Sequence, residues 1–535
     1  MPEMGRIPHQ LLLSFLVQSA LIRNAAAMFY YPNAQISQIE HILVDNWGAY
    51  ASNFSSAITP CDRYVTQIGD AAVKSGRTTS AQWLRVLFHD FANSHVEEGL
   101  GGIDASIGFE TYREENKGSA FNDSFTFWRP FVNEFIPMAD LLAMGTVMSV
   151  GLCGNGTKIP FRPGRVDASS EDPNTGVPEP GTSLEETLRQ FELNGFNQED
   201  AIALTACGHT LGSTHHRGFP EVSDNSTLSE NNTNGGINFD SSRGIFDPLV
   251  VQEYIDGTGQ RGGPLVTSFN ESSRSDLRLF ESDGNATMKA LYAQGEGFIG
   301  TCVDLLSRVI NTVPAGVVLQ DAVKPMAIKP VNVTWDIGDN GVPELSGRIR
   351  ILEKTSQDRT ITLMFSNGYN EMLTMEEEIG TSIFGETQFA PFVIAHSKID
   401  RSTSFTVDAD GLNTDNANNE FAIQDSYLII PSLSSVIGGS SVKVTVAMRD
   451  DANNDTELSV LATVPTAQPL TLGPKMVSAK IALERIAATA SGPNGFTLWE
   501  GSTDIDRPTG AVSVRLVRDG ETLDTLLLDG GVAGW

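Results

Sequence analysis

Apolar residues recur at every third or fourth position through much of the chain up to about residue 312, and polar stretches separate these segments. This spacing places apolar side chains on one face of a helix. We therefore expect helices over the following segments: 80–93, 126–150, 183–194, 198–211 and 282–312. Two stretches rich in Pro, Gly, Ser, Asn and Asp, 168–181 and 221–236, are expected to be loops.

The pattern changes after about residue 313. Short segments rich in Val, Ile and Thr alternate apolar and polar residues, which is typical of strands with one buried face. These segments are 331–335, 348–352, 360–365, 392–394, 427–430, 442–448 and 512–518. Many short strands of this kind favour a β-sandwich.

The expected fold class is a multidomain chain. A mainly α-helical domain is expected over residues 35–312 and a β-sandwich-like region, as one or two sandwiches, over residues 331–535. Residues 313–330 contain Pro314, Pro325 and Pro330 and are expected to link the two parts.

The N-terminus has the layout of a secretory signal. Arg6 precedes an apolar run over residues 11–22, and three small residues at 25–27 follow it. We expect a signal peptide over residues 1–27 that is removed on secretion, although a buried N-terminal helix would show a similar pattern. The run is too short to span a bilayer, so no membrane contact is expected.

Nine Asn-x-Ser/Thr sequons are typical of a glycosylated extracellular protein. They begin at Asn53, Asn122, Asn155, Asn225, Asn231, Asn270, Asn285, Asn332 and Asn454. In an oxidising compartment Cys61, Cys153, Cys207 and Cys302 become disulfide candidates with three possible pairings. We favour Cys61 with Cys153, whereas a buried free thiol is as plausible for Cys207 as a bridge.

The chain is strongly acidic, with a formal net charge of −30 and a pI near 4.6. An acidic surface repels a phosphate backbone, so nucleic acid is not expected as a partner. The acidity suits either solubility outside the cell or the binding of polyvalent cations, and does not choose between them.

Candidate chemistry begins in the segment 84–90, Leu-Arg-Val-Leu-Phe-His-Asp. Arg85 and His89 are four positions apart in a helical pattern and therefore share one face. A neutral His can move a proton between the oxygens of a peroxide, and an Arg can stabilise the charge on the departing oxygen. A pair of this kind is also common on a solvated face or around a core histidine.

Glu110 and Asn116 strengthen the first of these interpretations. An Asn side-chain oxygen that accepts from one imidazole nitrogen leaves the other nitrogen as the base, and Glu110 could fix the Asn in turn. Taken alone, these two residues would be ordinary polar loop residues.

With these residues the sequence resembles the plant, fungal and bacterial haem peroxidase superfamily, whose distal motif reads Arg-x-x-Phe/Trp-His and is followed by Glu and Asn. Residues 203–212, Ala-Leu-Thr-Ala-Cys-Gly-His-Thr-Leu-Gly, resemble the family's proximal helix. The resemblance covers about residues 60–310. It implies that His209 is the axial ligand of the haem iron and that Asp276 hydrogen-bonds its imidazole.

The same resemblance implies a haem-binding pocket in which Phe88 precedes the distal His and Phe239 lies on the proximal side. No Cys-x-x-Cys-His attachment motif is present, so the cofactor is expected to be non-covalent haem b.

Two calcium ions are expected from the resemblance, because carboxylates, hydroxyls and carbonyls in the matching loops are the oxygen ligands that calcium prefers. The distal set is Asp90, Gly102, Asp104 and Ser106. The proximal set is Thr210, Asp240, Ser242, the Ile245 carbonyl and Asp247. An ordinary turn is the alternative for either loop.

The expected function is that of a secreted haem peroxidase that reduces hydrogen peroxide and oxidises small phenolic or aromatic donors in one-electron steps. The acidic residues of manganese peroxidases are replaced by Thr78, Gln82 and His215, and the surface Trp of lignin peroxidases by Leu204. The alternatives are an extracellular adhesion or matrix protein that retains the scaffold, and a non-catalytic haem binder. Cell-wall or polysaccharide contact is one hypothesis for residues 331–535, and a structural appendage is the other.

Overall fold

The computed structural model describes residues 29–66, 74–338, 341–355, 358–410, 412, 419–452, 458–486 and 495–531. The expected signal peptide over residues 1–27 and the sequon at Asn454 lie outside these ranges. Within them, no helix combines the length and apolar character needed to cross a membrane.

Helices dominate the first part of the described chain, as the three-to-four spacing predicts. They are α2 (Ala34–Val44), α4 (Thr79–Phe91), α5 (Ala120–Trp128), α6 (Met138–Cys153), α7 (Leu184–Leu193), α8 (Gln198–Gly208), α9 (Leu249–Asp256), α10 (Pro264–Thr267), α11 (Ser275–Phe280), α12 (Ala286–Gln294) and α13 (Phe298–Asn311). Two short antiparallel strands, β1 (Ser213–His215) and β2 (Gly236–Asn238), lie among them.

Two of the expected helices are each interrupted, so their prediction as single elements is wrong. The segment 126–150 contains the end of α5, a short 3₁₀ turn and then α6, with Pro130 inside the turn and Pro137 as the N-cap of α6. Proline lacks the N–H that a continuous helix needs at these positions. The segment 282–312 is divided into α12 and α13 by a 3₁₀ turn at residues 295–297.

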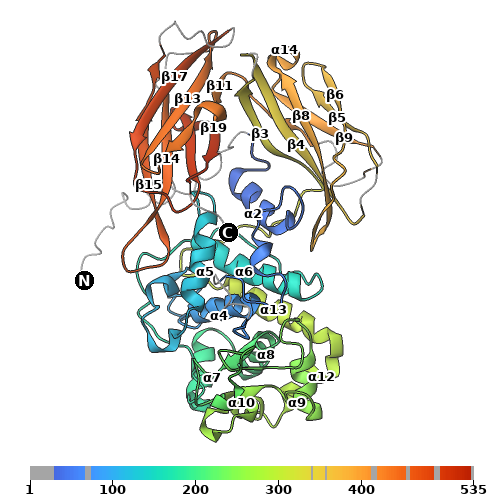
Figure 1. Ribbon diagram of the computed structural model, residues 1–535, viewed down its shortest axis with the longest axis vertical. Coiled ribbons are helices and arrows are strands. Elements are labelled where there is room, and N and C mark those ends of the chain that lie inside the picture. The colour runs from blue at the N-terminus through green and yellow to red at the C-terminus, as the bar shows by residue number, and fades with distance from the viewer. Residues whose placement is uncertain are drawn as a thin grey trace, which may run out of the picture.

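The second part of the described chain forms two β-sandwiches whose paired strands are all antiparallel. The first has the sheets β3-β4-β8-β7 and β10-β9-β5-β6, and the second has β11-β13-β17-β16, with β12 on β13, and β15-β14-β18-β19. Each has an apolar core, and the first core also includes Leu428, Ala447 and Phe496 of the second sandwich. Figure 1 shows them side by side at one end of the helical domain.

The strands of the first sandwich are β3 (Ile328–Ile337), β4 (Pro343–Glu353), β5 (Ile361–Phe365), β6 (Asn370–Leu373), β7 (Gly380–Ser382), β8 (Gly385–Ala395), β9 (Ser404–Ala409) and β10 (Phe421–Ala422), with the short helix α14 (His396–Ile399) after β8. Those of the second are β11 (Tyr427–Ile429), β12 (Ser435–Ile437), β13 (Ser441–Arg449), β14 (Leu458–Ala467), β15 (Pro474–Ala482), β16 (Glu484–Arg485), β17 (Phe496–Asp504), β18 (Val512–Arg518) and β19 (Glu521–Leu528).

Ion pairs connect both sandwiches to the helical domain. Glu40 on α2 is fully buried and pairs with Lys329 of β3 at 3.0 Å and with Arg350 of β4. On the second sandwich, Arg515 of β18 pairs with Glu134 at 2.7 Å. A buried carboxylate needs such partners, so these contacts fix where the sandwiches dock.

The chain between the helices and β3 runs along the helical domain. Main-chain N–H groups of Ala315, Gln320 and Val323 donate to carbonyls of the helical domain at 2.9, 2.8 and 2.9 Å. This segment is therefore hydrogen-bonded over much of its length.

Two disulfides brace the helical domain. Cys61 is bonded to Cys153, which confirms the preferred pairing. Cys207 is bonded to Cys302, so the alternative of a free thiol at Cys207 is wrong. The second bridge links α8 to α13.

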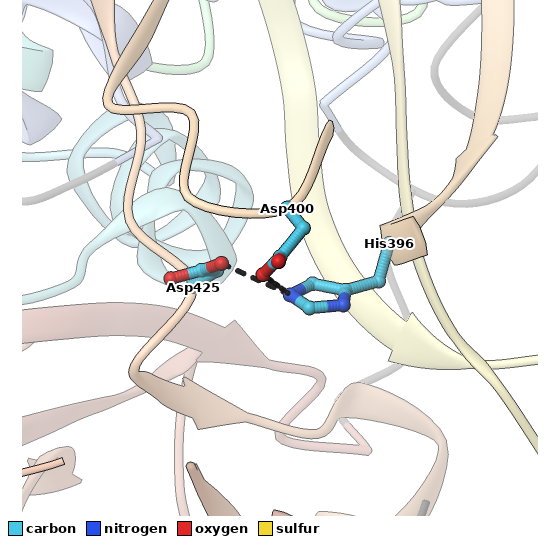
Figure 2. Close-up of side chains that lie close together, drawn as sticks. All are labelled: His396, Asp400 and Asp425. Carbon is cyan, nitrogen blue, oxygen red and sulfur yellow. Dashed lines mark hydrogen bonds and ion pairs between the residues drawn. The ribbon is translucent and has the colours of Figure 1, made fainter. Parts of the chain in front are cut away.

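A charged cluster lies where the two sandwiches meet (Figure 2). His396 lies near both Asp400 and Asp425, with its Nε2 2.9 Å from Asp425 Oδ2. The Arg449 guanidinium pairs with the same Asp425 oxygen and lies 2.6 Å from Asp400 Oδ1. Because the Arg449 guanidinium already pairs with the carboxylate oxygens of Asp400 and Asp425, we interpret the cluster as an ion-paired junction and not as a metal site.

Replacement of Asp425 by Asn is expected to lower the free energy of unfolding by about 1.5–3 kcal/mol at neutral pH, the range for hydrogen bonds to charged groups. Burial alone would raise the pKa of Asp425, but the bonds from His396 and the Arg401 main chain, with the Arg449 charge, outweigh it and lower that pKa. This stabilisation is therefore present above the ordinary carboxyl pKa and is lost as the pH falls through the lowered one. Thermal unfolding across pH measures it.

The matched control is Asp451→Asn, because Asp451 is exposed and also pairs with Arg449. Its loss should change the unfolding free energy by less than about 1 kcal/mol. Equal effects of the two substitutions would contradict the assignment of Asp425 as the central residue of the junction.

Candidate active site

Helix α4 presents Arg85 and His89 to a cavity of about 620 Å³ between α4 and α8. The two side chains lie one turn apart, as their spacing predicts. The cavity wall is mostly apolar, and its residues include Phe88, Leu204, Leu211, Phe239, Leu279 and Val309. A largely apolar cavity with few polar groups is typical of a cofactor or ligand site.

His89 is held by a hydrogen bond between its Nδ1 and Asn116 Oδ1 at 2.7 Å. The Asn116 amide donates to the main-chain carbonyl of Glu110 at 2.9 Å. Glu110 thus fixes Asn116 through its backbone and not through its carboxylate, which accepts from Asn93, Arg113 and the Asp172 N–H. No other described residue bonds to the Nε2 of His89, so that nitrogen is left for the cavity.

The charges of this pair suit a base beside a cation. Burial lowers the pKa of His89 to about 3, and the Arg85 charge adds to the shift. Burial and the Arg77 charge lower the pKa of Arg85 to about 10. At neutral pH the imidazole is therefore neutral and the guanidinium charged. Arg85 is directed by bonds to the carbonyls of Lys117, at 3.0 Å, and Glu115, at 3.4 Å.

On the opposite wall, His209 is the residue at which α8 ends. A capping box between Asn197 and Asp200 fixes the start of this helix. His209 Nδ1 lies 2.7 Å from Asp276 Oδ2 on α11, and its ring stacks on Phe239 with the centroids 4.0 Å apart. Asp276 thus sets the tautomer of the His209 ring, and Phe239 sets its plane.

These residues fit a haem. His209 lines the cavity with its Nε2 unbonded by any described residue, which is the free imidazole nitrogen that an axial ligand needs. His89 faces the same cavity from α4. The structure brings together all the expected residues of this site: Arg85, Phe88, His89, Asn116, Glu110, His209, Phe239 and Asp276.

The distal cation loop is compact. Asp90 accepts from the main-chain N–H groups of Asp104, Ala105 and Ile107, and Ser106 donates to it at 3.4 Å. Burial and mutual repulsion raise the pKa of Asp90 well above its usual range. Gly102, with φ +110°, lies in the same loop. The repelling charge is that of Asp104, which is also buried, and a bound cation would relieve this repulsion.

The proximal loop contains a carboxylate oxygen without a partner. Asp240 Oδ1 accepts from Ser242, while Asp240 Oδ2 is buried and bonded by none of the described residues. The Ser242 hydroxyl oxygen also lies 3.3 Å from the Ile245 carbonyl oxygen. Burial and the Asp247 charge raise the pKa of Asp240 to about 6. These groups fit a calcium ion.

Thr210 is the remaining residue of the expected proximal set. It directly follows His209 in the sequence. Its hydroxyl donates to the Cys207 carbonyl at 3.0 Å. Calcium bound to Thr210 and to the 240–247 loop would brace the end of α8 that carries His209.

Chelation of calcium is therefore expected to lower the free energy of unfolding by about 2.7 kcal/mol when the ion had been present at about 100 times its Kd. Asp240→Asn should remove the proximal part of this effect, because it removes the unpaired oxygen. Thermal unfolding with and without a chelator measures both, with the exposed Asp408→Asn as control. A chelator effect that is equal in wild type and Asp240→Asn would contradict a proximal site.

Sequence reasoning missed the residues that hold Glu110, namely Asn93, Arg113 and the main chain of Asp172. It also missed that the expected loop over residues 168–181 supplies Val177, Pro178 and Pro180 to the cavity wall. Proline and glycine predict a loop but not what it packs against, so the sequence carried no signal for this placement.

Comparison with known proteins finds peroxidases that are similar to part of the chain. The peroxidase family model matches residues 65–294. A WSC domain-containing protein of Arthroderma benhamiae is 36% identical over 323 residues, which cover 59% of this chain and 42% of that protein. The peroxisomal L-ascorbate peroxidase 5 of Arabidopsis thaliana is 33% identical over 146 residues, 27% of this chain and 51% of that enzyme.

Manganese peroxidase 3 of Phlebia radiata is 28% identical over 215 residues, 37% of this chain and 55% of that enzyme. The chain thus spans about half the length of these curated relatives. The matched region, residues 65–294, contains both histidines and most of the residues that line the cavity between them. Residues 65–294 thus match the peroxidase family, and over this region the chain is similar to plant and fungal peroxidases.

Proposed function

We propose that the protein is a haem-dependent peroxidase that reduces hydrogen peroxide and oxidises small phenolic or aromatic donors in one-electron steps. The observation that carries the proposal is one cavity with a neutral His and a charged Arg on one wall and an Asp-bonded His on the other. The arrangement supplies a base, a cation and an iron ligand at once.

His89 would take a proton from one peroxide oxygen at its Nε2 and return it to the other, because its Nδ1 is held by Asn116. Arg85 would stabilise the negative charge that develops on the departing oxygen. On the other side, Asp276 would strengthen His209 as an electron donor through their hydrogen bond. A bound haem b would supply the redox chemistry, because it would pass the two oxidising equivalents of hydrogen peroxide on to two one-electron donors.

The donor class follows from the residues around the cavity. Gln82 Oε1, at a place where manganese peroxidases carry an acid, accepts from Arg77 at 3.1 Å, and a guanidinium there disfavours a divalent cation. His215 is another of the three replaced positions, and burial lowers its pKa to about 4. Small organic donors at the haem edge are therefore the proposed reductants.

The scaffold-only alternative draws support from the similarity to a WSC domain-containing protein. It requires none of the hydrogen-bonded pairs His89–Asn116 and His209–Asp276, nor a charged Arg85 beside His89. A non-catalytic haem binder would require His209 but not Arg85. The joint presence of these residues favours the enzyme.

We further propose secretion, two structural calcium ions, and a cell-wall or polysaccharide contact through the β-sandwiches. The nine sequons and two disulfides support an extracellular setting. The docked sandwiches would hold the peroxidase domain at a fixed orientation to a wall. A pull-down of the full chain on insoluble polysaccharide separates the two roles. Retention on the polysaccharide would support the wall contact, and a chain that stays in solution would support a structural appendage.

The test of the enzyme is peroxide-dependent oxidation of a small phenol by the haem-loaded, purified chain. We expect turnover that requires both peroxide and haem and that is unchanged in Arg189→Gln, an exposed residue of α7 paired with Glu186. Haem uptake without phenol oxidation would favour the non-catalytic haem binder.

A further inference from the structure

The loop over residues 172–180 forms part of the cavity wall and is tied to the distal helix. Val177, Pro178 and Pro180 line the cavity. Just before them, the Gly176 N–H donates to the Asn93 side chain at 3.1 Å. The approach is close, because a Cβ built on Gly176 would lie 2.2 Å from the Ala92 carbonyl oxygen. This wall therefore packs closely against the end of α4 and is hydrogen-bonded to it.

Arg113 makes a second tie to the same loop. Its guanidinium donates to the main-chain carbonyls of Asp172 and Asn174, the latter at 2.9 Å. The same side chain pairs with the Glu110 carboxylate at 2.9 Å. The Arg113 and Glu110 side chains are 9% and 0% exposed, so the pair is shielded from solvent screening. A planar guanidinium is the side chain that can hold three such acceptors at once.

Glu110 connects this unit to the distal base. Its carboxylate also accepts from Asn93, at 2.7 Å, and from the Asp172 N–H, at 2.9 Å. Its main-chain carbonyl accepts from Asn116, which in turn holds His89. Glu110 thus takes part in two chains of hydrogen bonds. One leads to the cavity wall at residues 172–180, and the other leads to His89.

We propose that Arg113 is a positioning residue that couples the cavity wall at residues 172–180 to the distal base His89 through Glu110. The inference rests on the proposed function, since it concerns the same cavity. The cavity wall at residues 172–180 and the distal base would then share one buried support, Glu110 with Arg113. A single change at Arg113 then alters both, although Arg113 itself does not line the cavity.

Arg113→Gln removes the charge beside Glu110 and leaves two loop carbonyls without their donors. We expect cyanide, which needs a distal base to take its proton, to bind the haem-loaded chain about 10- to 100-fold more slowly, the scale expected for a small misplacement of a catalytic group. We also expect the KM for a small phenol to rise severalfold. Haem uptake, read from the Soret band, should be unchanged.

Arg113→Lys distinguishes the ion pair with Glu110 from the hydrogen bonds to the carbonyls of the 172–180 loop. A lysine keeps a positive charge near Glu110 but cannot donate to three acceptors in a fork. Cyanide binding should therefore recover to near the wild-type rate, while the KM for phenol stays raised. A residue needed only for folding would not give this division. Arg189→Gln is the matched control, because it removes an exposed Arg–Glu pair outside the cavity.

Hydrogen exchange on the haem-free chain gives a readout that does not depend on activity. The amides of Asp172 and Gly176, which donate to Glu110 and Asn93, should exchange faster in Arg113→Gln than in Arg189→Gln. Wild-type exchange at these amides in Arg113→Gln, with cyanide binding and KM unchanged, would overturn the coupling while leaving the proposed function intact. A wild-type chain that takes up no haem would overturn both.

Discussion

Replacement of His89 by Ala is expected to slow the reaction of the haem-loaded chain with hydrogen peroxide by about 100- to 10,000-fold, the range for loss of a general base. His89 has a neutral imidazole, an Nδ1 fixed by Asn116 and a free Nε2 directed to the cavity, and no other described residue offers that combination beside Arg85. Stopped-flow absorbance under single-turnover conditions measures the rate constant.

Haem content serves as the control for this substitution, because His209 and not His89 is the proposed iron ligand. The Soret band of the resting His89→Ala protein should match the wild type in intensity. Arg85→Lys provides a comparison, since it keeps a positive charge while losing the fork geometry, and should retain more activity than His89→Ala. A peroxide rate within threefold of wild type in His89→Ala would contradict the assignment of the base.

Replacement of His209 by Ala is expected to weaken haem retention by more than about 100-fold, because loss of a residue that merely supports a metal ligand already costs about 10- to 100-fold. His209 is the cavity-lining imidazole with an aspartate partner and a stacked phenylalanine. Transfer of haem to an excess of a high-affinity apoprotein measures the retention.

Asp276→Asn is the graded comparison for His209→Ala. It keeps the imidazole and removes only the negative partner at 2.7 Å, so haem should stay bound while the peroxide reaction slows by about 10- to 100-fold. Added imidazole should restore the Soret band of His209→Ala by filling the space of the lost ring. Full haem retention in His209→Ala without added imidazole would contradict the axial assignment.

Local patterns predicted much of the fold. Helix α4 and helix α7 lie within two residues of their expected bounds, because both have strong three-to-four spacing. The strands β5, β11 and β18 also match their expected segments. The patterns failed where one helical pattern continued across prolines at 130 and 137, and they missed β14, β15, β17 and β19, whose alternation is weaker.

The site was predictable to the extent that its chemistry lies in short motifs. Arg85 with His89, and the helix that ends at His209, could be placed because helical spacing fixes which side chains share a face. The backbone role of Glu110, the Arg113 unit and the bridge from Cys207 to Cys302 depend on contacts between segments far apart in the sequence. No local pattern encodes such contacts.

The Soret spectrum of the haem-loaded full chain, taken before and within milliseconds after one equivalent of hydrogen peroxide, decides whether the cavity acts as a peroxidase site. We expect a five-coordinate ferric spectrum that changes rapidly in wild type and in Arg189→Gln, and only slowly in His89→Ala. Absence of haem binding, or a bound haem whose spectrum peroxide does not change, would contradict the proposed peroxidase activity.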